Sequence, residues 1–294
     1  MIVITTPTGS IGRQVLQDLL ERGESIRVIA RDPARLPANT RDRIEVVQGS
    51  HGDTDIVNRA FAGADTVFWL PPPNPHAVSV EAGYVDFTRP ACEAFTRQGV
   101  KRVVGVSALG RGTTMASSAG QVTASLLMDD LIMSTGVNYR ALITPSFMDN
   151  VLRQLQPIKT SGTFTSPIAG DRQLPTCATR DIAFIAANLL LDGSWSGQQE
   201  VPILGPEDMS LNAMAHIMSE VLGRPIRFEQ IPGDAFKARL IGLGTSEAMA
   251  QATLDMMMAE NDGLDNAEPR TLASTTPTSF RQWCEEILKP AVLA

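Results

Sequence analysis

The pattern of apolar and polar positions changes along the chain. In the first half, short apolar runs rich in β-branched residues alternate with stretches whose apolar residues recur every three or four positions. The first pattern is typical of buried strands and the second of amphipathic helices. Strands separated by helices of this length predict right-handed crossovers and a parallel sheet. We therefore expect an α/β fold with a doubly wound parallel sheet of the Rossmann type.

Individual elements of this half follow from the same pattern. Strands are expected in MIVIT, SIRVIAR, RIEVVQG, DTVFWL, KRVVGVSALG and VNYRALI. Helices are expected in IGRQVLQDLLERG, TDIVNRAFAG, residues 78–98 and residues 118–135. Gly23 follows the first helix, where glycine commonly ends a helix, and Pro90 should kink the third.

The rhythm changes after Pro145. Polar pieces containing Gly and Pro lead to the helix RDIAFIAANLLLDG and the short strand EVPILG, and the rest is mostly helical, with a Met-rich segment at 246–260. We expect an NADP-binding Rossmann domain at 1–152 and a smaller, mostly helical substrate-binding region at 153–294. The short strand near 200–204 is expected to return to the sheet.

Composition and charge argue against nucleic-acid binding, membrane association, metal binding and a disulfide framework. The net charge of −7 disfavours nucleic acid or an anionic membrane as a partner. The three cysteines and three histidines are scattered, so neither a metal site nor a disulfide framework is expected. No basic leader precedes the first strand, and no apolar run approaches the roughly 20 residues that span a bilayer. We expect a cytoplasmic monomer or homodimer that acts on a small molecule.

The stretch TTPTGSIG stands between the first strand and the first helix, where dinucleotide-binding folds carry a glycine-rich turn. Gly9 and Gly12 are present, whereas Thr6 occupies the place of the first glycine. The N-terminus of the helix would face the pyrophosphate, and Thr8 and Ser10 add hydroxyls. We predict that this turn binds a dinucleotide; the plainer interpretation is a turn that only packs.

The end of the second strand indicates which dinucleotide. An NAD site usually has an acidic residue there, whereas this strand ends on Arg31 and is followed by Arg35. Guanidinium groups match a 2′-phosphate bidentately. Asp32 lies past the strand end and is expected to begin a turn. NADP(H) is therefore predicted over NAD(H), unless Arg31 is only a solvated charge.

With these motifs the chain resembles the NmrA-like branch of the atypical short-chain dehydrogenases/reductases. The family carries TGATGxxG, then Arg-Asp-Pro, GVKRVVxxSxxG and GxxYxxLRPxxFMxN, and this chain has TTPTGSIG, ARDPARL, GVKRVVGVSALG and GVNYRALITPSFMDN. Its C-terminal part is similar to the subgroup of ergot-alkaloid dehydrogenases, which reduce iminium ions with NADPH. The departures are Thr6 for glycine, Ser50 for an aspartate and Thr144 for an arginine. Beyond the turn and the arginines, the resemblance implies cofactor contacts from Ile11, Ser50, His51, Leu70, Pro71 and Ser107.

Ordinary short-chain dehydrogenases use a Tyr-x-x-x-Lys pair, which this chain lacks. Neither Tyr84 nor Tyr139 is followed by lysine four residues later, and by alignment with the family the pair falls near Gln121 and Ser125. Alcohol or ketone chemistry by that mechanism is excluded.

Two functions remain. The first is an NADPH-dependent reductase that transfers hydride to a small, fairly apolar acceptor, such as an iminium, a quinone or an activated alkene. An iminium is already cationic, so hydride alone completes its reduction, whereas quinones and enones develop oxyanions that hydroxyls or water could stabilise. The second is a non-catalytic NADP-binding redox sensor that regulates a protein partner. We favour the reductase.

The acceptor is expected beyond the carboxyl ends of the strands, beside the loops WLPPPNP, SALG and TPSFMDN. The candidate catalytic residues there are Ser107, Thr144 and His76. The candidate substrate contacts are Trp69, Phe147, Met148 and Asn150. Plainer interpretations are that Trp69 is a core residue, Ser107 a strand-end hydrogen-bonding group and His76 an exposed loop histidine.

Overall fold

The computed structural model describes residues 1–294 and divides into two compact units. Unit 1 comprises Met1–Ala108, Ala124–Ile143 and Ile182–Val201, and unit 2 comprises Leu109–Thr123, Thr144–Asp181 and Pro202–Ala294. Each unit is thus assembled from segments that are not adjacent in the sequence. None of the helices combines the length and the apolar character that a bilayer crossing requires.

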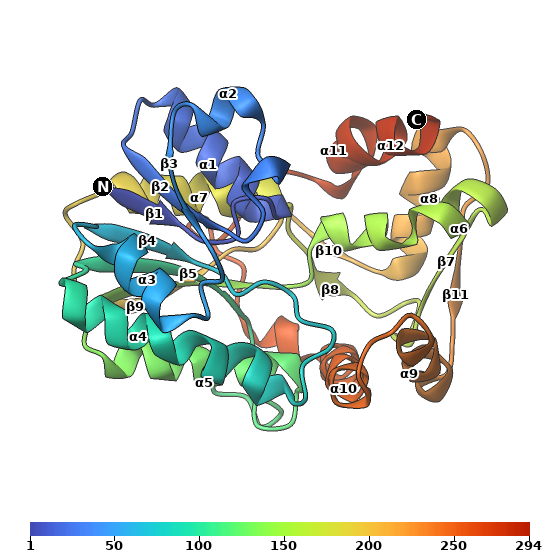
Figure 1. The fold of residues 1–294 in the computed structure, drawn as a ribbon. Helices are drawn as coiled ribbons and strands as arrows, with labels where there is room; N and C mark the ends of the chain where they lie inside the picture. Colours follow the sequence, from blue (N-terminus) through green and yellow to red (C-terminus); the bar gives the residue numbers. More distant parts are fainter. The chain divides into compact units, whose positions relative to one another are not determined.

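Unit 1 contains a seven-stranded sheet in the order β3-β2-β1-β4-β5-β6-β9 (Figure 1). Its strands are β1 (Ile2–Ile4), β2 (Ile26–Ala30), β3 (Glu45–Gln48), β4 (Thr66–Trp69), β5 (Arg102–Ala108), β6 (Asn138–Thr144) and β9 (Gln198–Pro202). β1 pairs in parallel with both β2 and β4, so the strand order reverses between β1 and β4. In open α/β sheets that reversal marks the crevice where ligands bind. The predicted doubly wound parallel sheet is confirmed.

Helices cover both faces of this sheet. They are α1 (Ser10–Glu21), α2 (Ala38–Arg41), α3 (Thr54–Phe61), α4 (Phe87–Gln98), α5 (Gln121–Ser134) and α7 (Thr179–Leu191). Figure 1 shows α3, α4 and α5 on one side and α1 and α7 on the other, and Arg22 at the end of α1 donates to Asn188 of α7 at 2.8 Å. Gly23 has a φ of +79° just beyond α1, which is the predicted helix stop.

The predicted helix over 78–98 is divided in the structure. A π-helical turn, Ala82–Asp86, precedes α4, and Pro90 lies inside α4. A proline within a helix lacks an N–H and clashes with the carbonyl four residues earlier, which here belongs to Asp86. The wider π turn ends at that residue, so the backbone departs from regular α-helix where the proline requires it.

Unit 2 combines helices with two small sheets. Its helices are α6 (Leu155–Ser161), α8 (Leu211–Leu222), α9 (Gly233–Gly242), α10 (Glu247–Asp262), α11 (Phe280–Trp283) and α12 (Lys289–Leu293). Its strands are β7 (Thr163–Ser166), β8 (Leu174–Pro175), β10 (Asp208–Met209) and β11 (Arg227–Gln230). β7 pairs in parallel with β11, and β8 pairs antiparallel to β10. These strands of two to four residues are too short to give the alternation from which strands are predicted.

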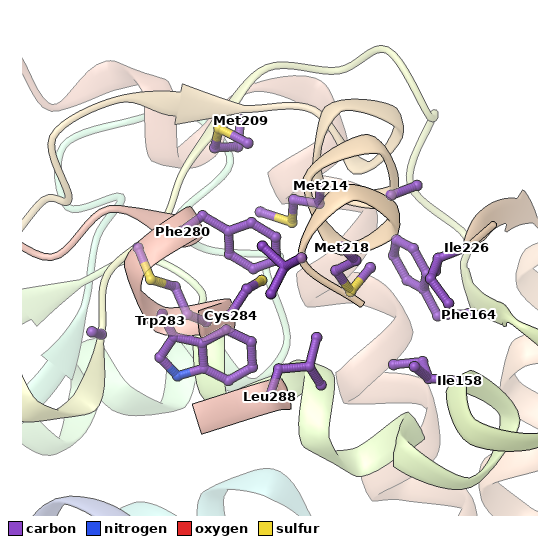
Figure 2. Close-up of a cluster of buried hydrophobic side chains, with 14 residues drawn as sticks. Ile158, Phe164, Met209, Met214, Met218, Ile226, Phe280, Trp283, Cys284 and Leu288 are labelled. Carbon is purple, nitrogen blue, oxygen red and sulfur yellow. The ribbon is translucent and has the colours of Figure 1, made fainter. Parts of the chain in front are cut away.

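A cluster of buried side chains forms the core of unit 2 (Figure 2). Phe280 and Trp283 of α11 stack at 5.6 Å, and Met214 and Met218 of α8 belong to the same cluster. The buried residues of α8 recur every three or four positions and form one face of the helix. Four methionines take part in the cluster, and their unbranched side chains fill irregular gaps.

We expect Met218→Ala to lower the free energy of unfolding by about 2–5 kcal/mol, because the fully buried side chain leaves a cavity. Urea unfolding followed by circular dichroism measures the change. Met258→Ala is the matched control: this side chain is 38% exposed, and its loss should cost less than about 0.5 kcal/mol. Equal losses in the two variants would contradict the assignment of Met218 to the core.

Candidate cofactor site and active site

The turn between β1 and α1 keeps the backbone of a glycine-rich turn although its first glycine is absent. Thr6 has a φ of +51° and is the one non-glycine residue with positive φ. A β-branched residue is rarely found in this region, and holding it there costs about 1–3 kcal/mol. The surrounding structure must therefore stabilise Thr6 in a conformation that glycine would adopt freely.

Hydrogen bonds to the end of β4 supply that stabilisation. The Thr6 hydroxyl donates to the carbonyl of Leu70 at 2.6 Å, and the Thr5 hydroxyl donates to the carbonyls of Phe68 and Leu70 at 3.0 and 3.3 Å. The Leu70 N–H in turn donates to the Thr5 hydroxyl at 2.9 Å. These bonds connect the carboxyl ends of β1 and β4, where the strand order reverses.

His51 completes the arrangement around Leu70. Its Nε2 lies 3.1 Å from the Leu70 carbonyl, and its ring meets those of Trp69 and Phe87 edge-on at 5.3 and 4.9 Å. Burial, assisted by the positive charge of Arg31, lowers the pKa of His51 to about 4. The ring is therefore neutral at pH 7, and its Nε2–H donates to the carbonyl.

The two remaining glycines of the turn are required by close packing. A Cβ on Gly12 would lie 2.2 Å from the Thr6 carbonyl oxygen, and one on Gly9 would lie 2.9 Å from Cγ2 of Thr6. The start of α1 can therefore approach the turn only with glycine at both positions. Ser10 is exposed and Thr8 half-buried at this end, whereas Ile11 is buried on the inner face of α1.

The arginines at the end of β2 are exposed, as a phosphate contact requires. Arg31 follows the strand directly, and Arg35 ends a 3-10 turn, Pro33–Arg35. The Asp32 carboxylate accepts from the N–H of Ala34 at 3.1 Å and caps that turn, so Asp32 begins a turn as expected from the sequence. Ser50, past β3, accepts from the N–H of Gly52 at 3.2 Å.

Other candidates of unit 1 lie in different surroundings. Trp69 is fully buried and donates from Nε1 to the Thr88 hydroxyl at 3.2 Å, so in this structure it is a core residue. Pro71 is buried, and His76 is exposed in the proline-rich loop. Ser107 is buried and donates its hydroxyl hydrogen to Asp129 on α5. The sequence offered no signal for Asp129 beyond its place in a predicted helix.

The candidates of unit 2 follow the end of β6. Thr144 is buried, and its carbonyl accepts from the N–H of Leu109 at 3.3 Å. Phe147 and Asn150 are half-buried, whereas Met148 belongs to the buried cluster of Figure 2 and has a packing role. Gln121, where the family tyrosine would fall, donates to the Thr253 hydroxyl at 2.6 Å.

Unit 2 also buries two carboxyl groups that sequence reasoning did not single out. Glu260 and Asp265 are almost fully buried, and the Ser146 hydroxyl lies 3.4 Å from Glu260. Burial raises the pKa of Glu260 well above its usual range, and the charge of Asp265 adds to the effect. Burial likewise raises the pKa of Asp265 to about 7. The pair therefore holds a proton near neutral pH, beside a loop that follows β6.

Two hollows of the surface contain none of the predicted site residues. One, of about 630 Å³ in unit 2, is lined by Ala169, Asp171, Arg172, Gln173, Asn261 and Asn266. The other, of about 510 Å³ in unit 1, is lined by Glu45, Val46, Val47, Gln48 and Arg59. The candidate site rests on the turn and the strand ends, not on these hollows.

Comparison with known proteins agrees with the geometry of unit 1. Residues 7–187 match a family model described as NAD(P)H-binding. The chain is 28% identical over 290 residues to (4-alkanoyl-5-oxo-2,5-dihydrofuran-3-yl)methyl phosphate reductase of Streptomyces griseus, with 97% of each chain covered. It is 25% identical to the NAD(P)H azoreductase of Xenophilus azovorans, over 86% of this chain and 84% of the relative.

A solved structure supports the fold. The triphenylmethane reductase of Citrobacter sp., complexed with NADP(H), matches with a TM-score of 0.80 and 20% identity, over 96% of this chain and 98% of that one. Fold, turn and family match together define an NAD(P)H-binding protein, and the two relatives named as reductases put it in the oxidoreductase class. The chain belongs to the NAD(P)H-binding family of NmrA-like, atypical short-chain dehydrogenases/reductases, which confirms the resemblance found in its motifs.

The buried His51 gives stability a pH dependence of known sign. The ordinary histidine pKa is 6.5, and the folded value is about 4, so between these values the unfolded chain binds a proton that the folded chain does not. We expect the free energy of unfolding to fall by about 2 kcal/mol more in the wild type than in His51→Gln when the pH drops from 7.5 to 5. Denaturant unfolding at the two pH values measures the difference.

His76→Gln is the control, because this exposed histidine should leave the pH dependence of the wild type unchanged. If His51→Gln and the wild type lose stability in parallel, His51 does not stay neutral in the folded protein.

Proposed function

We propose that this protein is an NADPH-dependent reductase that transfers hydride to a small, fairly apolar acceptor without a Tyr-x-x-x-Lys pair. The observation that carries the proposal is the Thr6 turn, which keeps a positive φ and two obligatory glycines at the β1/β4 reversal. Bound NADPH would supply hydride to the acceptor carbon and leave as NADP⁺.

The residues present fit this cofactor. The cradle from Thr6 to Gly12 would hold the pyrophosphate at the N-terminus of α1, with help from the hydroxyls of Thr8 and Ser10. Arg31 and Arg35 would hold the 2′-phosphate at the end of the neighbouring parallel strand. Asp32 is occupied in capping its own turn, which weakens the case for an NAD-type ribose contact.

The absence of a Tyr-x-x-x-Lys pair indicates which class of hydride acceptor the protein can reduce. Gln121 and Ser125 stand where the tyrosine and lysine would fall, and both are hydrogen-bonded to side chains of the protein. An acceptor such as an iminium, a quinone or an activated alkene does not need that pair. The relatives named as an azoreductase and a furanone phosphate reductase support a reductase of small molecules. Ser107, Thr144, Phe147 and Asn150 remain the candidates that would frame the acceptor.

A non-catalytic NADP sensor is the second candidate, because a protein that does not turn over a substrate would also lack the Tyr-x-x-x-Lys pair. Purified protein mixed with NADPH and a panel of iminium, quinone and enone acceptors distinguishes the two. Acceptor-dependent loss of NADPH absorbance supports the reductase, and tight NADPH binding without turnover on any acceptor supports the sensor.

We expect Arg31→Ala to weaken NADPH binding by about 10- to 100-fold, because charge-assisted hydrogen bonds to the 2′-phosphate are lost. NADH lacks that phosphate, so its affinity should stay within about twofold. Calorimetric titration with each cofactor measures both effects. Arg59→Ala, an exposed arginine on α3, is the matched control and should change neither affinity. An equal loss for NADPH and NADH would contradict the role of Arg31.

A further inference from the structure

Unit 2 contains a serine that lies beside a buried carboxyl group. Ser146 stands two residues past the end of β6, and its hydroxyl lies 3.4 and 3.5 Å from the two carboxyl oxygens of Glu260 on α10. The Ser146 backbone N–H acts as a hydrogen-bond donor to the carboxyl group of Asp265. The Ser146 carbonyl accepts from the Thr176 hydroxyl at 2.8 Å. The backbone of Ser146 is therefore held on both sides, and its hydroxyl has a fixed place next to Glu260.

No cation balances the two carboxyl groups. Glu260 and Asp265 are 4% and 3% exposed, and neither forms an ion pair with a lysine, an arginine or a histidine. Arg172, which packs against Gly263 between them in the chain, donates to Asn266 at 2.9 Å instead. Two uncompensated charges are costly to bury, so the pair retains a proton near neutral pH. The pKa of Glu260 is the more strongly raised of the two, so the proton resides on Glu260.

Ser146 connects this proton to the surface. A protonated Glu260 can donate its O–H to Oγ of Ser146, which leaves the hydrogen of Ser146 for a further acceptor. The separation of 3.4 Å is longer than an ordinary O–H···O bond, as is common in an active site before its ligand binds. Ser146 is partly exposed whereas Glu260 is buried, so the hydrogen-bonded route from Glu260 runs through Ser146.

The other buried carboxyl group beside a candidate serine is closed by packing. Asp129 has no exposed surface and accepts hydrogen bonds from Ser107 and, at 2.6 Å, from the Tyr139 hydroxyl. A Cβ on Gly105 would lie 2.3 Å from that hydroxyl oxygen, so Tyr139 reaches Asp129 only because β5 has a glycine at this position. Ser107 is itself 5% exposed. Of the two serines that contact buried carboxyl groups in this way, Ser146 is the more accessible.

We propose that Ser146 is a catalytic residue that protonates the reduced acceptor, and that Glu260 acts through it as a positioning residue that replaces the proton. The inference rests on the proposed reductase function, which supplies the hydride. Hydride addition to the β-carbon of an enone forms one C–H bond and moves the π electrons to the carbonyl oxygen. That oxyanion takes the hydroxyl hydrogen of Ser146, whose oxygen takes the hydrogen of Glu260. Water then reprotonates the Glu260 carboxylate.

Kinetics of the full chain with NADPH and a cyclic enone test this relay. Glu260→Gln keeps the shape of the side chain but has no acidic hydrogen, so kcat should fall about 100-fold, and Ser146→Ala should cause a similar loss. Asp262→Asn, which changes an exposed carboxylate on the same helix, is the control and should stay within about twofold of the wild type. Ser146→Ala keeps the test valid if Glu260→Gln does not fold.

The pH profile separates a proton source from a group that only packs. Only protonated Glu260 can donate, so kcat of the wild type should fall as the pH rises through the pKa of the pair, and Glu260→Gln should lose this dependence. The titratable groups around Glu260 are Asp265, whose pKa burial raises to about 7, and beyond it the Cys177 thiol. Burial raises the pKa of Cys177 well above its ordinary value, so this thiol stays uncharged throughout.

A coloured probe tests the proton transfer without turnover. The phenolate oxygen of para-nitrophenolate stands in for the oxyanion of the reduced acceptor, and the yellow phenolate becomes nearly colourless when it takes a proton. The full chain, saturated with NADP⁺, is mixed with the probe slightly above neutral pH. We expect the wild type to bleach the probe, and Glu260→Gln and Ser146→Ala to leave it yellow.

The two proposals fail in different ways. An unchanged absorbance with the wild type, or a wild-type pH profile in Glu260→Gln, would overturn the relay. NADPH binding without turnover of any acceptor would overturn the reductase itself, and the phenolate probe would still report whether Ser146 and Glu260 transfer a proton.

Discussion

The candidate cofactor site depends on the carbonyl oxygen of Leu70. Three donors converge on it, the hydroxyls of Thr5 and Thr6 and the ring N–H of His51, at 3.3, 2.6 and 3.1 Å. The oxygen lies just past β4, beside the end of β1, where the order of the strands reverses. Its bond to Thr6 offsets the cost of holding a threonine in the left-handed backbone conformation, and that conformation in turn places the Thr6 carbonyl against Gly9, the N-cap of α1, and Gly12 within the helix. The turn, the switch point and the placement of the His51 ring are therefore one coupled arrangement.

The sequence alone predicted the parts of this arrangement that depend on local pattern. The strands of the main sheet and the helices between them follow from periodicity, and the turn follows from two glycines in the right place between a strand and a helix. Asp32 before Pro33 indicated a turn, and its carboxylate caps that turn. Thr6 was identified as the replacement of a glycine, but its positive φ depends on Leu70, which lies 64 residues away in the chain. Periodicity carries no information about such a partner.

Long-range contacts also explain the residues that the sequence did not reveal. Asp129 and Asp130 are adjacent and chemically identical, and only the rotation of α5 makes the first fully buried and leaves the second exposed. The sequence allowed Trp69 to be either a substrate contact or a core residue. In the structure it is fully buried and donates to the hydroxyl of Thr88, so it belongs to the core. Glu260 lies near the end of the Met-rich helix α10, and its partner Ser146 is 114 residues away in the chain. The local sequence pattern therefore does not show that the carboxyl group of Glu260 is buried. The periodicity of apolar residues predicts which face of a helix is buried, but it does not predict the hydrogen-bond partners that the buried side chains meet.

The missing side chain at Gly105 has a consequence for how this family can vary. The Tyr139 hydroxyl occupies the space that a side chain at position 105 would need. Its oxygen would lie 2.3 Å from a Cβ there, which is shorter than any real contact between such atoms. An alanine at position 105 therefore needs a side chain at position 139 that lacks both the hydroxyl and the ring, for instance valine, because Cε2 and Cζ of Tyr139 would also lie 2.9 and 3.0 Å from the new Cβ. The two positions lie on different strands and far apart in the chain, yet they should change together across evolution. Where a relative has both the glycine and the tyrosine, the aspartate of α5 should accompany them, because its carboxyl group accepts the hydrogen of the Tyr139 hydroxyl.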